Sequence, residues 1–256
     1  MLLPAVAVVV IGAARAYGET ITDAHYGGPV ERYGHFAPGR PHEYARVVAT
    51  TSTGRRLELE LPSVEVFEDV APRLVALGPG AAPDLLTIVS GRDSGARLAV
   101  IRLRDGRLQM VAQSEPIGTA MRWLNPVGVA DLNGDGRPEI AAVITPHIGG
   151  TLRIYRLVGP RLVGIAALGG FSNHVYGSGE LRLSAVVPID GRMRLVIPDT
   201  TRRQLRIIGL EGDMAREVGR CTLSEPVSGP VEVLAAATVS VGLSSERRIV
   251  DLTRCR

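Results

Sequence analysis

The stretch "VGVADLNGDGRPEIAAVI", residues 127–144, joins two apolar segments through a centre rich in oxygen-bearing side chains. The alternating and β-branched residues on either side of that centre favour strands over helices. The centre holds three acidic residues, an asparagine, two glycines and a proline, a composition typical of a tight connection. This stretch therefore predicts a strand, a turn and a second strand.

The same pattern recurs at a spacing of 55 residues. Asp84 lies 55 residues before Glu139, and Arg194 lies 55 residues after it. The matching segments are "RLVALGPGAAPDLLTIVS" (73–90) and "LSAVVPIDGRMRLVIPD" (183–199). Both contain an apolar segment, a turn-forming centre and another apolar segment, so the chain contains an internal repeat.

Each repeat continues with a second pair of strand-like segments. Alternating segments that end in leucine, each followed by a turn with glycine, lie at 98–103, 152–157 and 205–210. Each repeat therefore reads as four short strands. The three predicted units span 72–120, 124–175 and 180–225.

Four-stranded antiparallel units at this period are typical of a β-propeller, in which stacking covers the apolar faces of neighbouring units. We therefore predict an all-β fold, a small β-propeller of four-stranded antiparallel blades. Four blades are expected, with five as the alternative, because strands near both ends are taken to share one closing blade. The predicted organisation is a signal peptide at 1–16, an extended N-terminal arm at 17–44 and the propeller at 45–256.

The signal-peptide prediction rests on the first apolar run. The run from Leu2 to Ala14 is too short to cross a bilayer, which takes about 20 residues. It ends in Ala14-Arg15-Ala16, a small-x-small pattern typical of a signal-peptidase site. No basic residue precedes the run, so a buried first strand is the alternative. The prediction implies a periplasmic or secreted protein whose mature chain begins near Tyr17 and has no transmembrane segment.

Charge and cysteine content narrow the possible functions and the cellular compartment. Arginine carries all 29 positive charges, and the net charge is only +3. The arginines are spread along the chain, which argues against a nucleic-acid-binding surface. Cys221 and Cys255 match no metal motif. A disulfide formed in an oxidising compartment and two buried free thiols are both open for this pair.

The pattern Asp-x-Asn-x-Asp-Gly-x-x-Glu at 131–139 places oxygen donors at alternate positions. Such a loop can wrap around Ca²⁺, which takes six to eight oxygens at about 2.3–2.6 Å. An EF-hand is excluded because Ala142 occupies the twelfth position and the flanks read as strands. A plain hairpin turn is the alternative, which explains the glycines but not the alternation. The predicted metal ligands are the side chains of Asp131, Asn133, Asp135 and Glu139 and the backbone carbonyl of Arg137.

The loop within a propeller-type repeat resembles the FG-GAP/VCBS repeat proteins, which carry calcium loops of this type between blade strands. The resemblance covers roughly 64–225, and its specific part is 131–139. It implies one structural Ca²⁺ in the middle unit, because the other two units lack the ligands. It also implies binding, recognition or scaffolding outside the cytoplasm, with an unidentified protein or carbohydrate partner.

No nucleophile elbow, phosphate-binding loop or dinucleotide fingerprint is found, so no catalytic or cofactor-binding residue is assigned. The chain is accordingly predicted not to be an enzyme. The alternative is a cell-envelope hydrolase or lyase that uses His174 in the polar connection "GGFSNHVYGSG" (169–179). Trp123 and Arg122, in the preceding connection, are expected on the same face. A structural accessory of a larger envelope assembly is a third hypothesis.

The N-terminal arm contains three of the five histidines. His25, His35 and His42, with Glu43, could in principle form a metal site. No pair has the short spacing of a metal clip. We therefore expect hydrogen-bonded histidines in an arm that covers one face of the propeller.

Overall fold

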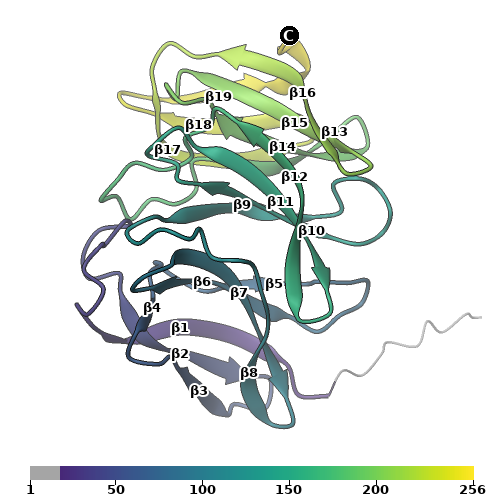
Figure 1. The fold of residues 1–256 in the computed structure, drawn as a ribbon. Helices are drawn as coiled ribbons and strands as arrows, with labels where there is room; N and C mark the ends of the chain where they lie inside the picture. The colour runs from purple at the N-terminus through teal and green to yellow at the C-terminus, as the bar shows by residue number, and fades with distance from the viewer. Residues whose placement is uncertain (1–17) are drawn as a thin grey trace, which may run out of the picture.

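The computed structural model describes residues 18–256, which form nineteen strands and one short 3-10 helix (Figure 1). The predicted all-β class is confirmed. No helix in this part of the chain has the length and apolar character needed to cross a membrane. The predicted signal peptide at 1–16 lies outside the described residues.

The strands follow one another with short connections. The N-terminal strands are β1 (Ile21–Pro29), β2 (Tyr44–Thr51), β3 (Arg56–Glu60) and β4 (Glu65–Phe67). The next four are β5 (Arg73–Val75), β6 (Asp84–Gly91), β7 (Gly95–Arg104) and β8 (Arg107–Gln113). The middle repeat forms β9 (Leu124–Ala130), β10 (Glu139–Ile144), β11 (Thr151–Val158) and β12 (Arg161–Gly169). The third forms β13 (Ala185–Ile189), β14 (Arg192–Pro198), β15 (Gln204–Glu211) and β16 (Met214–Thr222). The chain ends with β17 (Val227–Ala235), β18 (Thr238–Leu243), β19 (Arg247–Asp251) and η1 (Leu252–Arg254).

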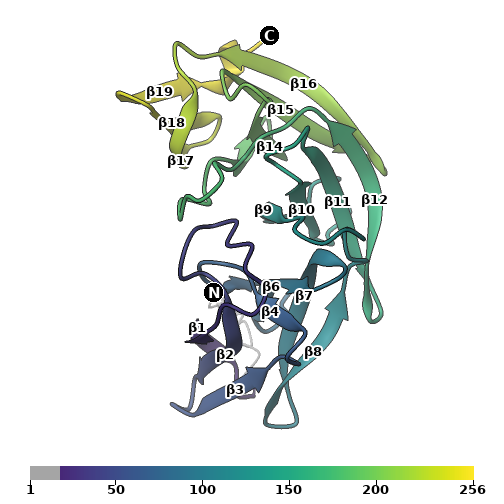
Figure 2. The same ribbon diagram turned by 60° about the vertical axis from the view of Figure 1, so that its left-hand side comes forward.

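Antiparallel pairing in chain order defines five units. We call them unit 1 (β1–β3), unit 2 (β5–β8), unit 3 (β9–β12), unit 4 (β13–β16) and unit 5 (β17–β19). Strand β4 pairs with both β2 and β6 and so joins units 1 and 2. A single parallel pair, Arg161 with Gln113, joins units 2 and 3. Figure 2 shows the units along an open arc, which gives the chain a propeller-like β fold.

The repeat is visible in the strand register as well as in the sequence. In units 2, 3 and 4, the pairing of the third strand with the fourth shifts by one position. The shifts lie at Val100/Ile101, Ile154/Tyr155 and Ile207/Ile208. A bulge at one place in a strand pair increases local twist and bends the strand. The three repeats thus share the same irregularity at the same pair of strands.

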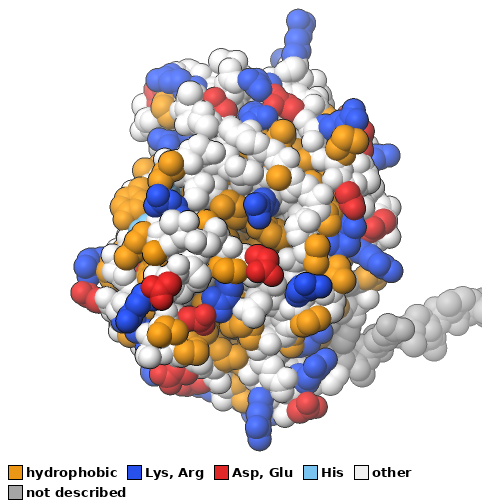
Figure 3. Space-filling view, in the orientation of Figure 1, with side chains coloured by type: hydrophobic (Ala, Val, Ile, Leu, Met, Phe, Trp, Pro, Cys, Tyr) orange, Lys and Arg blue, Asp and Glu red, His pale blue; other side chains and the backbone are white. Residues whose placement is uncertain are grey.

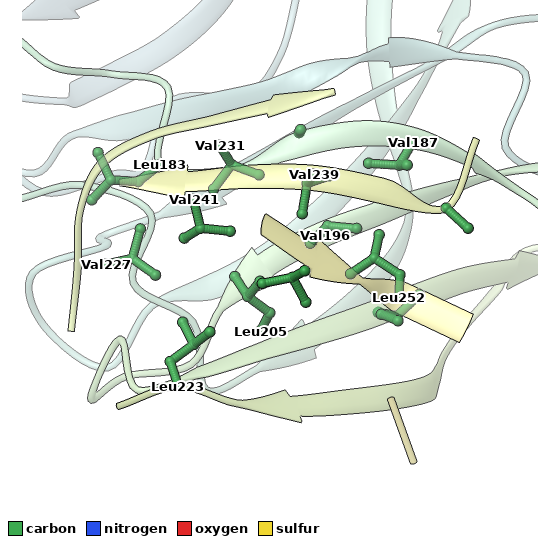
Figure 4. Close-up of a cluster of buried hydrophobic side chains, with 14 of the residues drawn as sticks. Leu183, Val187, Val196, Leu205, Leu223, Val227, Val231, Val239, Val241 and Leu252 are labelled. Atoms are coloured by element: carbon green, nitrogen blue, oxygen red, sulfur yellow. The ribbon is translucent and has the colours of Figure 1, made fainter. Parts of the chain in front are cut away.

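Four hydrophobic cores fill the spaces between the five units, because successive residues of a strand point to opposite faces. Leu85 lies in the core between units 1 and 2, and Leu86 lies in the next core. The same alternation carries Ile140 and Ala141 into the two cores that flank unit 3. The fourth core, drawn in Figure 4, packs unit 4 against unit 5. Each unit is thus stabilised by its neighbours.

The two ends of the chain differ from the predicted arrangement. Within residues 18–256, β17–β19 pair only with one another, so the terminal strands do not share a closing blade. Unit 1 instead takes its third strand, β1, from the segment that was predicted to be an extended arm. Ile21 and Tyr26 are buried in the core of that unit. The prediction of an arm without a core is therefore wrong for 21–29.

A disulfide joins Cys221 in β16 to Cys255 after η1. The open question about these two cysteines is thereby settled in favour of a bond. The backbones of Arg220 and Arg256 also exchange hydrogen bonds beside it. Together these contacts fix the chain end against unit 4.

The surface does not gather charge of one sign on the face drawn in Figure 3, where acidic and basic side chains are interspersed. Fifteen ion pairs link residues of the described chain, and arginine provides the cation in fourteen of them. This distribution agrees with the spread of arginine along the sequence.

Candidate functional site

The predicted calcium loop forms the connection between β9 and β10. Asp131 accepts hydrogen bonds from the backbone N–H groups of Gly134, Asp135 and Gly136, at 2.7–3.0 Å. Asp135 in turn accepts the N–H of Arg137 at 2.8 Å, and this bond lowers the pKa of the Asp135 carboxyl. The carboxylates are therefore solvated by the backbone of their own loop. Asn133 takes part through its side-chain oxygen, which accepts the N–H of Asp135.

Glu139 is fully buried and has two protein partners. Its Oε2 accepts the N–H of Leu132, and its Oε1 lies 3.0 Å from Nη2 of Arg156 on the neighbouring strand. Arg156 also pairs with the exposed Asp213. The charge of Glu139 is thus balanced by an arginine.

The same pair recurs in unit 2 but not in unit 4. In unit 2, Asp84 binds Arg102 at the equivalent positions of the second and third strands. In unit 4, the arginine is on the second strand instead, and Arg194 lies over Gly209. The acid at the start of the second strand therefore has a structural explanation that does not require a metal ion.

Residues 18–256 contain no group of three or more His, Cys, Asp or Glu side chains placed to hold a metal ion. Glu139 does not fit the predicted ligand set while it is bound to Arg156. The calcium site at 131–139 accordingly stays a prediction. The same finding applies to His25, His35, His42 and Glu43 of the N-terminal segment.

A different cluster of polar residues gathers on the loop face of units 3 and 4. A cavity of about 200 Å³, which we call the histidine pocket, is bordered by side chains from three connections. These connections are the β10–β11 turn, the β12–β13 connection and the β14–β15 turn. The polar and aromatic lining residues are His147, Ser172, His174, Tyr176, Thr200 and Arg202.

The repeat explains why these connections meet. Arg202 follows His147 by 55 residues, so the two side chains occupy equivalent turns of adjacent units. Gly150 allows the β12–β13 connection to pass close to the first turn, because a Cβ there would lie 2.0 Å from the carbonyl oxygen of Phe171. The N–H of Phe171 donates to the carbonyl of Gly150 at 3.0 Å. His174 is thereby placed beside His147.

The two histidines form a directed hydrogen-bond chain. Nε2 of His174 lies 2.8 Å from the carbonyl oxygen of Ser178, which can only accept, so Nε2 carries the hydrogen. Burial lowers the pKa of His174 to about 4, so its ring is neutral near pH 7 and Nδ1 is an acceptor. Nε2 of His147 must then donate to that Nδ1, 2.7 Å away.

His147 is neutral for the same reason. Burial, with the nearby His174, lowers its pKa to about 3. Its Nε2 carries the hydrogen donated to His174, so its Nδ1 holds a free lone pair. No described residue hydrogen-bonds to that atom, so Nδ1 is free to accept a hydrogen bond.

Aromatic rings fix the position of the pair. Trp123 stacks on His147 with an interplanar angle of 3° and lies 4.7 Å from His174, measured between ring centroids. The indole N–H donates to the carbonyl of Glu68. Tyr176, more than half exposed, meets His147 edge-on and donates its hydroxyl to the carbonyl of His35. The expected grouping of Trp123 with His174 is therefore observed.

Two buried carboxylates hold the β1–β2 connection against this cluster. Glu43 accepts the backbone N–H groups of Gly34, His35 and Phe36 at 2.8–2.9 Å. Oε1 of Glu68 accepts the backbone N–H of Ala37 and lies 2.8 Å from Nδ1 of His35, which forms no hydrogen bond there. The segment lies against the cluster through the backbone of His35, whereas Nδ1 of the His35 ring has no hydrogen-bond partner among the described residues. His42 contacts the hydroxyl of Tyr44, whereas His25 lies within β1.

A larger cavity, of about 450 Å³, is lined by residues from 70–73, 126–127 and 179–184. Its two ionic side chains near the rim, Glu180 and Arg182, form a two-pronged pair with each other. Arg73 is likewise bound to the buried Asp69. The charged groups of this cavity are thus already neutralised, which leaves the histidine pocket as the stronger candidate site.

Sequence reasoning identified His174 and Trp123 but missed His147 and Arg202. Both missed residues lie in short turns without a motif of their own. The 55-residue repeat relates the two residues, and applying that spacing to the sequence would have placed them on one face.

Comparisons with known proteins give no family assignment. No protein-family model matches the chain, and no curated protein matches it. One similar solved structure is a Bacteroides fragilis protein titled a "putative 6-phosphogluconolactonase", with a TM-score of 0.48 and 16% identity over 84% of this chain. Another is the WD40 domain of SCAP from fission yeast, with a TM-score of 0.40 and 10% identity over 93% of this chain. The chain spans 62% and 51% of the lengths of these two structures.

The prediction that the chain is not an enzyme is corrected by this comparison. A propeller-like chain of similar structure carries the name of an enzyme, so the lack of a short catalytic motif does not exclude catalysis. At these TM-scores and identities, the likeness assigns no activity or substrate to the present chain.

Proposed function

We propose that the chain binds a small organic molecule in the histidine pocket. The observation that carries this proposal is the convergence of His147, His174 and Arg202, from three separate connections, on one cavity of about 200 Å³. Cavities that combine aromatic walls with a few oriented polar groups are typical ligand sites. The fixed tautomers also support binding, because Nδ1 of His147 is ready to accept a hydrogen bond from a ligand hydroxyl or amide.

The proposed scaffold is an open β-propeller with the five units as blades. Its support is the series of meanders in units 2 to 4, the flanking three-stranded units and the four cores between neighbours. Membership of the FG-GAP/VCBS type and a structural Ca²⁺ rest on the loop at 131–139 alone. Export from the cytoplasm is supported by the Cys221–Cys255 disulfide, because such bonds persist mainly in oxidising compartments.

Blocking the pocket tests the proposed function. Thr200 is exposed and borders the cavity, so Thr200→Trp is expected to fill it without disturbing the core. A panel of sugars, sugar acids, nucleosides and amino acids is screened by thermal shift. At least one compound is expected to raise the melting temperature of the wild type and of Thr200→Ala but not of Thr200→Trp. Compounds that shift all three proteins equally would contradict the proposal.

Catalysis at the same pocket is the second candidate. It is favoured by the His147–His174 chain, because an oriented imidazole with a free lone pair can accept a proton from water or a ligand hydroxyl. The pKa of about 3 makes His147 a weak base at neutral pH, and binding is therefore the first proposal. Turnover of a generic ester, phosphate or glycoside substrate that is lost in His147→Gln and in His174→Ala would support catalysis.

A further inference from the structure

The charged groups of the histidine pocket suggest which class of ligand enters it. Arg202 is the permanent charge among the side chains that border the cavity, and no aspartate or glutamate borders it. This contrasts with the larger cavity, where Glu180 neutralises Arg182 at the rim. The histidine pocket therefore has a positive charge with no balancing carboxylate in its wall.

The contacts of Arg202 leave part of its guanidinium available. Nε donates to the carbonyl of Val227 at 3.1 Å, and Nη1 lies 3.4 Å from the hydroxyl of Ser172. The structure has no hydrogen bond or ion pair at Nη2 within residues 18–256. The carbonyl contact holds the side chain in place, because it fixes the Nε edge of the guanidinium.

Asp199, the acidic residue nearest to Arg202 in sequence, forms its hydrogen bonds with other residues. Asp199 accepts the N–H groups of Arg203 and Gln204 and the hydroxyl of Thr201. It forms no ion pair with Arg202. The backbone of Arg202 has a φ of 56°, a left-handed conformation that costs a non-glycine residue about 1 kcal/mol or more. The turn thus holds an arginine at a position where the backbone disfavours it.

We propose that the ligand of the histidine pocket carries an oxyanion, a phosphate or a carboxylate group, and that Arg202 binds it. This inference rests on the proposed function and names its ligand class. An arginine that presents N–H donors in a plane matches the oxygens of either group. The hydroxyl of Ser172, beside Nη1, is a second donor for the same oxyanion. The acceptor Nδ1 of His147 then contacts a hydroxyl elsewhere on the ligand.

The full chain is titrated with inorganic phosphate and with acetate, each at constant ionic strength against chloride. Saturable binding of at least one anion is expected, and the tighter of the two identifies the source of the oxyanion. Arg202→Gln is expected to weaken that binding about tenfold or more, because a charge-assisted hydrogen bond is lost. Arg203→Gln is the matched control. Arg203 lies in the same turn, donates to the carbonyl of Ser224 and does not border the pocket, so its variant should bind within about twofold of the wild type.

Equal binding by wild type and Arg202→Gln, or no binding of either anion by the wild type, would overturn the inference. If Arg202→Gln does not fold, anion binding by Arg202→Lys is measured instead. This variant keeps the charge but loses the planar pair of donors, so several-fold weaker binding is expected and unchanged binding is a contradiction. Thr200→Trp tests the proposed function separately. If a neutral compound binds the wild type but not Thr200→Trp, the pocket is a binding site and the oxyanion requirement is wrong.

Discussion

At the residue scale, burial determines the protonation of His147 and His174. Neither ring has a carboxylate partner to favour its charged form, and Arg202 lies close enough to oppose protonation of both. The folded chain therefore holds two neutral imidazoles that its unfolded form would protonate in mild acid.

This difference predicts how stability depends on pH. The folded pKa values of about 3 and about 4 lie below the unfolded value of about 6.5, so only the unfolded chain gains protons as the pH falls from 7 to 5. The free energy of unfolding should fall over that interval by up to about 1.4 kcal/mol per pH unit for each histidine. Urea denaturation at several pH values measures the slope.

A double variant provides the comparison. His147→Gln with His174→Gln should flatten the pH dependence, whereas His25→Gln, in β1 and away from the pocket, should leave it unchanged. An equally steep slope in the double variant would show that other groups cause the loss of stability.

At the element scale, the cross-strand acid–arginine pair is a structural feature shared by units 2 and 3. Asp84–Arg102 and Glu139–Arg156 occupy the same strand positions, and in both pairs the acid is buried. Removing one partner of a buried pair leaves an uncompensated charge, which is more costly than losing an exposed contact.

Arg156→Gln is therefore expected to lower the free energy of unfolding by about 3 kcal/mol. Arg161→Gln is a suitable control, because Arg161 is exposed at the start of the adjacent strand. The change should be below about 0.5 kcal/mol for the control. Chemical denaturation measures both values, and similar losses in the two variants would contradict a special role for the pair.

The calcium prediction for the same loop has a separate test. If Ca²⁺ binds at 131–139, a chelator should lower the melting temperature of the wild type, because an ion that binds only the folded chain stabilises it. Asp135→Ala should then remove the sensitivity to chelator. A melting curve that chelation leaves unchanged would count against the metal site, and the backbone bonds of Asp131 with the Arg156 contact would suffice to hold the loop.

The sequence was most informative where elements repeat. The spacing from Asp84 to Glu139 to Arg194 located the strands of units 2 to 4, because apolar alternation and turn residues recur together. The segment "ITDAHYGGP" (21–29) lacks that signal: it is polar and contains two glycines, yet it forms β1. Its order comes from pairing with β2, a contact that local sequence does not encode.

At the scale of the whole molecule, the arc depends on contacts between neighbouring units. The described chain has no strand pairing between units 1 and 5, so neither end is supported by closure. The site was harder to predict than the fold for this reason. Its lining residues come from three connections of units 3 and 4, and their meeting depends on how these neighbouring units pack.

Reduction of the Cys221–Cys255 disulfide tests how the C-terminal end is held. The two cysteines are 34 residues apart in sequence, and the loop-entropy relation gives about 3–4 kcal/mol for a loop of that size. The variant Cys221→Ser/Cys255→Ser should lose a similar amount of unfolding free energy, measured by denaturation. A loss below about 1 kcal/mol would mean that η1 and the Arg220–Arg256 contacts hold the end without the bond.

The disulfide also makes the two ends of the arc unequal. Fraying from the C-terminus is opposed by a covalent bond, whereas β1 is retained by hydrogen bonds and packing alone. Transient opening should therefore begin at unit 1, whose β1–β2 connection contributes the carbonyl of His35 to Tyr176. Such opening would release the hydroxyl of Tyr176, a side chain that borders the histidine pocket, so ligand occupancy and the slow opening of the N-terminal strands should be thermodynamically linked.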